Sequence, residues 1–267
     1  CLSLRDATRR RFWPRQEFGS LGADAGIQIL CDQLQGMVKG AVVRGNVVAS
    51  LSGGKDSRTV LAASRDIFES IEYFTLGSDS HGSVDATIAR QLAEKNGLNH
   101  KVVQTGPGEP WLTALFDEMT GGLVWGSAHA IVEPMRREIA SSNYIHMNGA
   151  AGEICSPFFW HSANPTAVRK RLLMSKHGSK PRQIREAFDE WYETVEQFSP
   201  TTIYNLAFAE QLEGRWQGIV ETASNIFYES FTPFCNRKII ETICSLPNAV
   251  VCEGKLRFEI IERLGPQ

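Results

Sequence analysis

The chain has 267 residues, and its 28 basic and 30 acidic side chains give a formal net charge of −2 at pH 7. This length allows one large domain, and the balanced charge argues against DNA as a partner, because a general polyanion calls for a strongly basic face. No apolar run approaches the roughly 18 residues of a membrane-spanning helix, so we expect no membrane attachment.

The six cysteines include no C-x-x-C pair, the spacing typical of structural zinc sites and of redox couples. We therefore interpret them as reduced thiols, which are usual in the cytoplasm. The sequence predicts a cytoplasmic protein.

Helical and strand patterns alternate along the first half of the chain. Residues 1–22 are polar and basic, and we interpret them as a linker that enters a domain over residues 23–267. The predicted elements are helices over 25–42, 56–68, 83–97 and about 129–140, with strands over 46–51, 71–77, 99–105 and 142–149. Strands that alternate with helices of this length form βαβ units, so we expect an α/β fold with a parallel sheet and helices on both faces.

The chain beyond about residue 160 has a helical pattern and predicts a helical C-terminal annex. Its predicted helices cover 185–198, 203–227 and 236–246, and Asn236 stands where it can cap the last of them.

The turn Ser-Gly-Gly-Lys-Asp-Ser over residues 52–57 follows a predicted buried strand and opens a predicted helix. Unpaired backbone N–H groups at such a helix start attract phosphate, and the two glycines let the backbone approach it closely. The spacing differs from that of a P-loop, which has four residues between its glycines and a hydroxyl residue after its lysine. Because Asp56 would repel phosphate, its presence implies a cation between them, and we predict Mg²⁺.

This turn is similar to the signature of the PP-loop ATP pyrophosphatases, and two further motifs resemble the asparagine synthetase family. The stretch HMNGAAGEICSPFFW over 146–160 resembles the family's second loop, with Gly149 at its glycine and Glu153 at its metal-binding carboxylate. The stretches 231–247 and 254–266 resemble the family's following segments, so the resemblance extends from about residue 12 to the last residue.

The resemblance implies an adenine nucleotide alpha hydrolase-like fold and a synthetase that uses ATP and Mg²⁺. Such an enzyme adenylates a carboxylate, releases pyrophosphate, and lets ammonia or an amine form the amide; a glutaminase domain before the linker would supply ammonia. By this resemblance the metal and catalytic residues are Asp56 and Glu153. The residues it assigns to ATP binding are Leu51, Ser52, Gly53, Gly54, Asp56, Ser57, Leu76 and Gly149, with Leu51 and Leu76 bordering adenine through their backbones.

Departures from the family pattern leave the substrate open. Ala150 stands where typical asparagine synthetases carry glutamate, and Asn236 where they carry aspartate, so a small-molecule or peptide carboxylate can replace aspartate. We expect the family's catalytic lysine beyond the last residue, and its loss would instead give an inactive nucleotide-binding homologue. A tRNA-modifying PP-loop enzyme for thiolation or lysidine formation is the other alternative, although the lack of paired cysteines weakens thiolation.

Overall fold

The computed structural model describes residues 11–77, 82–106, 109–122, 128–139, 143–161, 164–175 and 181–265. Within them, five parallel strands form one sheet in the order β3-β2-β1-β4-β5. The strands are β1 (Asn46–Ser50), β2 (Ile71–Gly77), β3 (His100–Gln104), β4 (Tyr144–Met147) and β5 (Glu229–Phe231). In the central strand, Val47 pairs with Ile71 of β2 and with Ile145 of β4. The predicted parallel α/β fold is confirmed.

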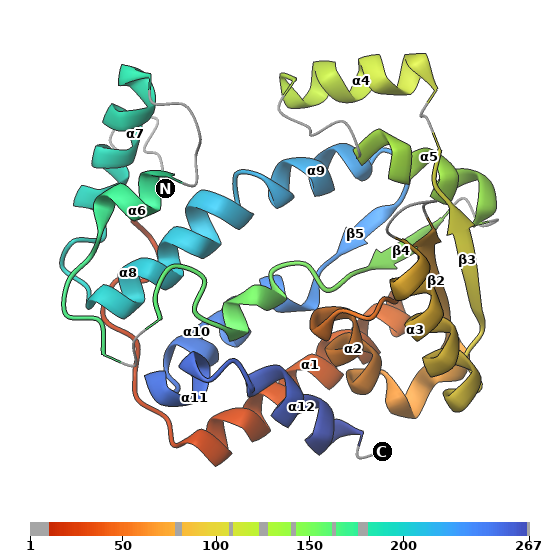
Figure 1. Cartoon of the computed structure of the whole chain (residues 1–267), viewed down its shortest axis with the longest axis horizontal. Helices are drawn as coiled ribbons and strands as arrows, with labels where there is room; N and C mark the ends of the chain where they lie inside the picture. The colour runs from red at the N-terminus through yellow and green to blue at the C-terminus, as the bar shows by residue number, and fades with distance from the viewer. Residues whose placement is uncertain are drawn as a thin grey trace.

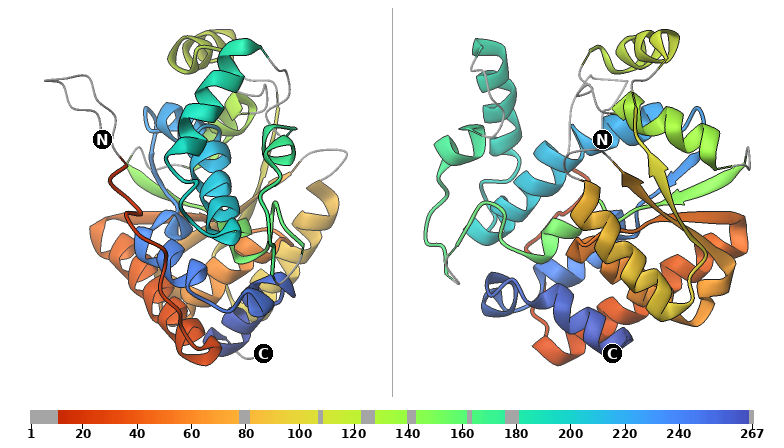
Figure 2. Two further views of the ribbon diagram at one scale, coloured as in Figure 1. Left: turned by 90° about the vertical axis from the view of Figure 1, so that its left-hand side faces the viewer. Right: turned by 45° about the vertical axis from the view of Figure 1, so that its right-hand side comes forward.

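Helices cover both faces of the sheet (Figures 1 and 2). The elements between the first four strands are α2 (Lys55–Ala63), the 3₁₀ helix η1 (Arg65–Ser70), α3 (Gly82–Asn96), α4 (Pro110–Thr120) and α5 (Ala128–Glu138), and α1 (Ala23–Arg44) precedes them. Alternate residues of a strand point to opposite faces. Val47 accordingly joins a core cluster with α1 and α2, whereas Val48 joins a second cluster with α4 and α5.

The C-terminal half adds one strand to the same sheet and further helices. Its elements are η2 (Gly152–Cys155), α6 (Lys170–Ser175), α7 (Arg182–Glu193), α8 (Pro200–Leu206), the π-helical η3 (Ala207–Glu213), α9 (Gln217–Ser224), η4 (Pro233–Cys235), α10 (Arg237–Cys244), α11 (Asn248–Cys252) and α12 (Leu256–Leu264). The helix expected over 203–227 is therefore three successive elements. The sequence did not predict the strand β5, which extends the sheet beyond β4. Helices α6 to α8 lie to one side of the sheet (Figure 1).

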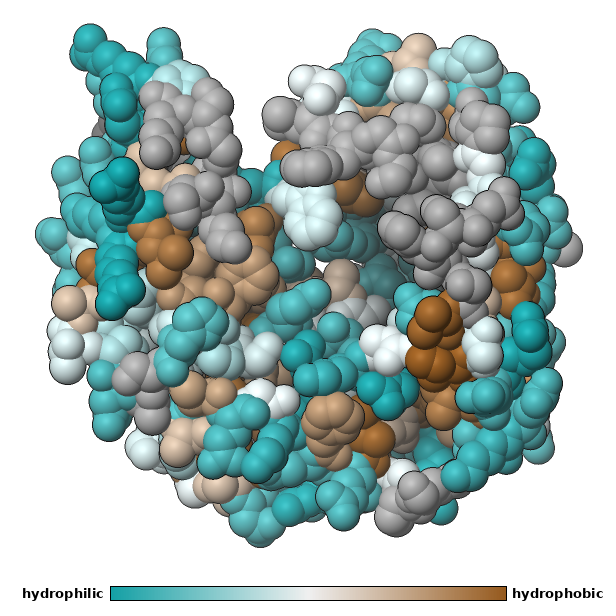
Figure 3. Space-filling model, viewed as in Figure 1, coloured by the Kyte–Doolittle hydropathy of each residue, from teal (hydrophilic) through white to brown (hydrophobic). Residues whose placement is uncertain are grey.

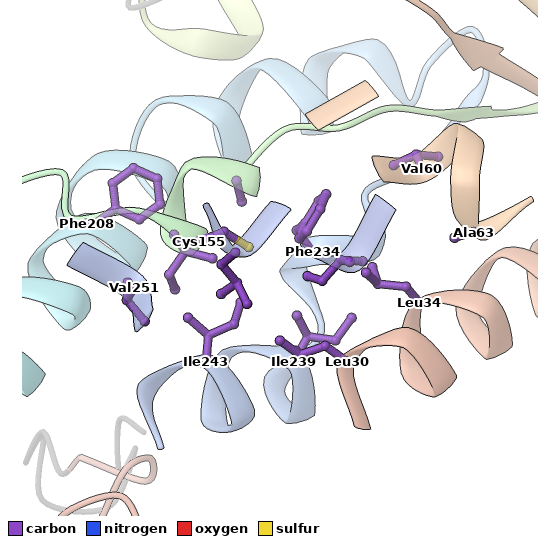
Figure 4. Close-up of a cluster of buried hydrophobic side chains, with 14 of the residues drawn as sticks. Leu30, Leu34, Val60, Ala63, Cys155, Phe208, Phe234, Ile239, Ile243 and Val251 are labelled. Carbon is purple, nitrogen blue, oxygen red and sulfur yellow. The ribbon is translucent and has the colours of Figure 1, made fainter. Parts of the chain in front are cut away.

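Side chains from both halves of the chain share one buried cluster. Figure 4 shows Leu30 and Leu34 of α1 beside Phe234, Ile239 and Ile243 from the region of α10. The segment before α1 also packs on the C-terminal helices, since the Arg11 guanidinium pairs with Glu210 and the Leu21 N–H donates to the Ser245 carbonyl at 2.8 Å. Among the described helices, none combines the length and the apolar character that crossing a bilayer requires.

Candidate functional site

The turn over residues 52–57 joins β1 to α2 at the carboxyl end of the central strand. Hydrogen bonds of two serine hydroxyls stabilise the tight conformation of the turn. Ser52 Oγ and Ser57 Oγ lie 2.9 Å apart, and the Gly54 N–H donates to Ser52 Oγ at 3.1 Å. The Gly53 N–H donates to the Asp85 carboxylate of α3 at 2.8 Å. The strand, turn and helix expected of a phosphate-binding loop are present, and its serine hydroxyls can rotate toward a ligand.

The loop after β4 packs directly against this turn through two glycines. A Cβ atom on Gly149 would lie 2.8 Å from the Asp56 carbonyl carbon, and a Cβ atom on Gly152 would lie 2.6 Å from Asp56 Cγ. Real Cβ atoms do not approach other atoms so closely. Glycine at both positions therefore lets the second loop bring Glu153, at the start of η2, close to Asp56.

Acidic side chains gather where the two loops meet. Burial is the main cause that raises the pKa of the Glu153 carboxyl, the nearby negative charge of Asp56 raises it further, and the Arg257 guanidinium opposes both. Arg257 forms an ion pair with Asp56 and donates to Ser156 Oγ at 3.1 Å. This buried arginine of α12 was not among the predicted site residues, because nothing in the sequence links it to a turn some 200 residues earlier.

Most of the predicted residues line one cavity of about 450 Å³. The predicted residues at its wall are Ser52, Gly54, Asp56, Ser57, Leu76, Gly149 and Glu153. The structure does not bring Gly53 or Leu51 to this wall. Leu51 is buried, its N–H donates to the Phe74 carbonyl at 2.8 Å, and its own carbonyl accepts from Thr75 Oγ1 at 2.7 Å. Figure 3 shows a hollow on this face of the molecule, between the region of α4 and α5 and the region of α6 to α8.

Two further carboxylates lie near the loops, and sequence reasoning missed both. Burial, followed by the negative charge of Glu153, raises the pKa of Glu213 to about 7, while a hydrogen bond from the Ala151 N–H opposes the rise. Glu221 of α9 lines the cavity and accepts from Asn148 Nδ2 at 3.0 Å. Both belong to the segment expected to form one long helix, in which no spacing marked them as functional.

Part of the cavity wall is aromatic and includes an imidazole whose two ring nitrogens are buried. The His146 ring lies between Phe74 and Tyr228, with ring centroids 5.5 and 5.3 Å away. Burial lowers the pKa of His146 to about 4, so the ring is neutral at pH 7. Neither ring nitrogen has a hydrogen-bond partner among the described residues.

The donor set fits a magnesium nucleotide. Mg²⁺ is commonly held by one or two carboxylates together with phosphate oxygens and waters, and Asp56 and Glu153 supply two carboxylates at one cavity wall. In the part of the chain that the structure describes, no group of three or more His, Cys, Asp or Glu side chains could hold a metal ion alone. This arrangement suits a metal bound together with its nucleotide.

Comparisons with known proteins find a matching family model and similar solved structures. The family model for asparagine synthase matches residues 30–197. A search of curated proteins finds no match. Among solved structures, the chain is similar to an NH3-dependent NAD synthetase from Campylobacter jejuni in complex with the nitrate ion, with 15% sequence identity, a TM-score of 0.30, and coverage of 76% of this chain and 91% of that chain.

Proposed function

Since the chain belongs to the asparagine synthase family, whose model matches residues 30–197, we propose that it is an ATP-dependent ligase that forms an amide from a carboxylate and an amine. The carboxylate oxygen attacks the α-phosphorus of ATP, and the bond to pyrophosphate breaks. Ammonia or an amine then attacks the acyl carbon, and AMP leaves with the electron pair of the acyl–oxygen bond. The attacking nitrogen loses one proton to water, and the product is an amide.

One observation supports this proposal more than any other: the close packing of Gly149 and Gly152 on Asp56. It places the second loop, with Glu153, against the turn at the N-terminus of α2. The two carboxylates then line the same cavity as Ser52 and Ser57. Binding of a magnesium nucleotide requires groups that bind the phosphate anion and groups that bind the metal cation within one cavity.

In the first step, one set of residues would bind pyrophosphate and another would bind Mg²⁺. The hydroxyls of Ser52 and Ser57 and the N–H groups at the start of α2 would bind pyrophosphate, since the helix dipole favours an anion there. Asp56 and Glu153 would hold Mg²⁺, which neutralises charge that develops on the leaving pyrophosphate. The Asp56 carboxylate would then share its charge between the metal and Arg257.

We propose a small-molecule or peptide carboxylate other than aspartate as the substrate. Ala150 lines the cavity where typical family members carry a glutamate. The rest of the wall includes Val132, Met135 and Val220, which suit an apolar group better than a second carboxylate.

Exchange of labelled pyrophosphate into ATP tests the adenylation step. We expect exchange that depends on one carboxylate from a broad panel and that falls at least about 100-fold in Asp56→Asn and Glu153→Gln, since each removes a proposed ligand of the Mg²⁺ that would neutralise charge on the reacting phosphates. The matched control is Asp189→Asn, on the exposed side of α7, which should exchange like the wild type. A folded protein that binds magnesium ATP but shows no exchange with any carboxylate would overturn the proposal.

A further inference from the structure

A second cavity, of about 210 Å³, lies beside the first and shares Gln217 and Glu221 of α9 with it. Ala151 and Ile154, on either side of Glu153, belong to its wall, so it reaches the loop that carries the predicted metal ligand. Most of its other lining is apolar, from Phe208, Ala209, Phe234, Cys235 and Ile240. The cavity is therefore an apolar compartment next to the proposed reaction centre.

The wall of this second cavity also contains a buried carboxylate that lacks a counterion. Glu213 is 9% exposed, and the Ala151 N–H donates to its side chain. Within the described residues, no Lys, Arg or His forms an ion pair with Glu213 or with Glu221. Buried carboxylates are rare unless they are paired, because burial of an uncompensated charge is costly. Burial raises the pKa of Glu213 to about 7, so a cation bound beside it would favour the ionised carboxylate, and this side chain marks a place for a cation.

The shape and lining indicate which cation fits. Glu213 lines the second cavity and not the first, where Asp56 and Glu153 lie. A hydrated metal ion would gain nothing from walls of Phe208, Phe234 and Ile240. Ammonia occupies about the volume of one water molecule, roughly 30 Å³, and would leave most of the cavity empty. An ammonium group attached to a small apolar body satisfies both the carboxylate and the apolar walls.

We propose that the second cavity binds the amine substrate, and that this substrate is a small organic primary amine rather than ammonia. This inference rests on the proposed function. Glu213 pairs with the ammonium group near Ala151, Glu221 stands at the wall shared with the nucleotide cavity, and the apolar lining receives the alkyl or aryl group. The cavity is smaller than the roughly 300 to 1,000 Å³ of sites for drug-sized ligands, which limits the amine to a few carbon atoms or one ring.

Ligand-observed saturation-transfer NMR with n-butylamine hydrochloride at pH 7 tests the site directly, because an alkylamine is protonated at this pH. We expect saturation of the butyl protons by the wild-type protein, and a Kd at least about tenfold weaker for Glu213→Gln. Cys235→Trp, which fills the cavity from its exposed side, should abolish the signal. Butan-1-ol should bind more weakly than butylamine, since it lacks the charge.

Matched variants keep the test interpretable. Val43→Trp adds the same side chain at a position that is 88% exposed on α1, and it should bind butylamine like the wild type. Circular dichroism identifies any variant that fails to fold, and Glu213→Gln preserves the shape of the side chain. Equal binding of butylamine by the wild type, Glu213→Gln and Cys235→Trp, or no binding at all, would overturn the inference, as would displacement of butylamine by MgCl₂ alone.

The inference and the proposed function can fail separately. Pyrophosphate exchange needs the carboxylate and ATP but no amine, so it reports on adenylation alone. Exchange without specific butylamine binding would leave the ligase proposal standing and remove the amine site. Specific butylamine binding without exchange would keep the cation site and remove the adenylation chemistry.

Discussion

Gly152 leaves room for the carboxyl group of Asp56, and together with Gly149 it allows the close approach of the two loops. A Cβ atom there would lie 2.6 Å from Asp56 Cγ and 2.8 Å from Asp56 Cβ. The Asp56 carboxylate is also restrained by its ion pair with Arg257. Any side chain at position 152 must therefore displace the proposed metal ligand.

We expect Gly152→Ala to weaken binding of magnesium ATP at least about tenfold and to lower the free energy of unfolding by about 1 to 3 kcal/mol, as overpacking does. Isothermal titration and urea unfolding measure the two effects. Gly36→Ala is the matched control, since nothing lies within 4 Å of a Cβ atom there and alanine favours the helix by about 0.5 to 1 kcal/mol. Unchanged affinity in Gly152→Ala would show that the loops do not depend on this contact.

The sequence allowed prediction of some residues of the site and not of others. Asp56 and Glu153 follow strands that are parallel neighbours, and the carboxyl ends of such strands meet at one edge of a sheet, so their shared cavity could be expected. Arg257 and Glu213 reach the site from α12 and from the end of η3. Their placement depends on tertiary packing, which no local pattern encodes.

At the level of elements, predictions succeeded where short-range chemistry decides. Asn236 was expected to cap a helix, and its side chain accepts from the Lys238 N–H at 2.8 Å at the start of α10. A helix was expected over 83–97, and α3 ends at Asn96, directly before Gly97 with its φ of +64°. Both features depend on a few neighbouring residues, which the sequence displays.

We expect Asn236→Ala to lower the free energy of unfolding by about 1 kcal/mol, because the Lys238 N–H loses its partner. Asn236→Asp keeps a side-chain acceptor and should unfold at nearly the same urea concentration as the wild type. Equal midpoints for the alanine and aspartate variants would contradict a capping role.

Predictions of elements failed where the backbone departs from a regular period. The segment expected as one helix over 203–227 contains the π-helical η3, which shifts the register of side chains before α9 begins. The strand β5 has only three residues, too few to show the alternation by which a strand is recognised. Its place in the sheet comes from pairing with β4.

At the scale of the whole molecule, burial of the His146 ring nitrogens at the cavity wall links stability to pH. Burial lowers the pKa of His146 to about 4, whereas an exposed imidazole titrates near 6.5. Between about pH 6.5 and pH 4, the His146 imidazole therefore binds a proton in the unfolded chain but not in the folded chain. The resulting stability is fully present above about pH 6.5 and is lost as the pH falls toward 4.

We expect His146→Phe to flatten the dependence of unfolding free energy on pH between about 6.5 and 4, by up to about 1.4 kcal/mol per pH unit. Urea unfolding at a series of pH values compares the two proteins, and only the difference between their slopes is diagnostic. Parallel curves across this range would mean that His146 becomes protonated in the folded protein as readily as in the unfolded chain.

The strand order has a consequence for the time course of folding. β1 lies at the centre of the sheet, yet its Val47 pairs on one side with Ile71 and on the other with Ile145, a neighbour from far along the chain. Closing so long a loop is slow, and ribosomes add only about 5 to 20 residues per second. The edge of β1 that pairs with β4 therefore has no partner strand during much of synthesis. An open strand edge is a template for aggregation, so nascent chains should be the stage at which this protein most needs chaperones.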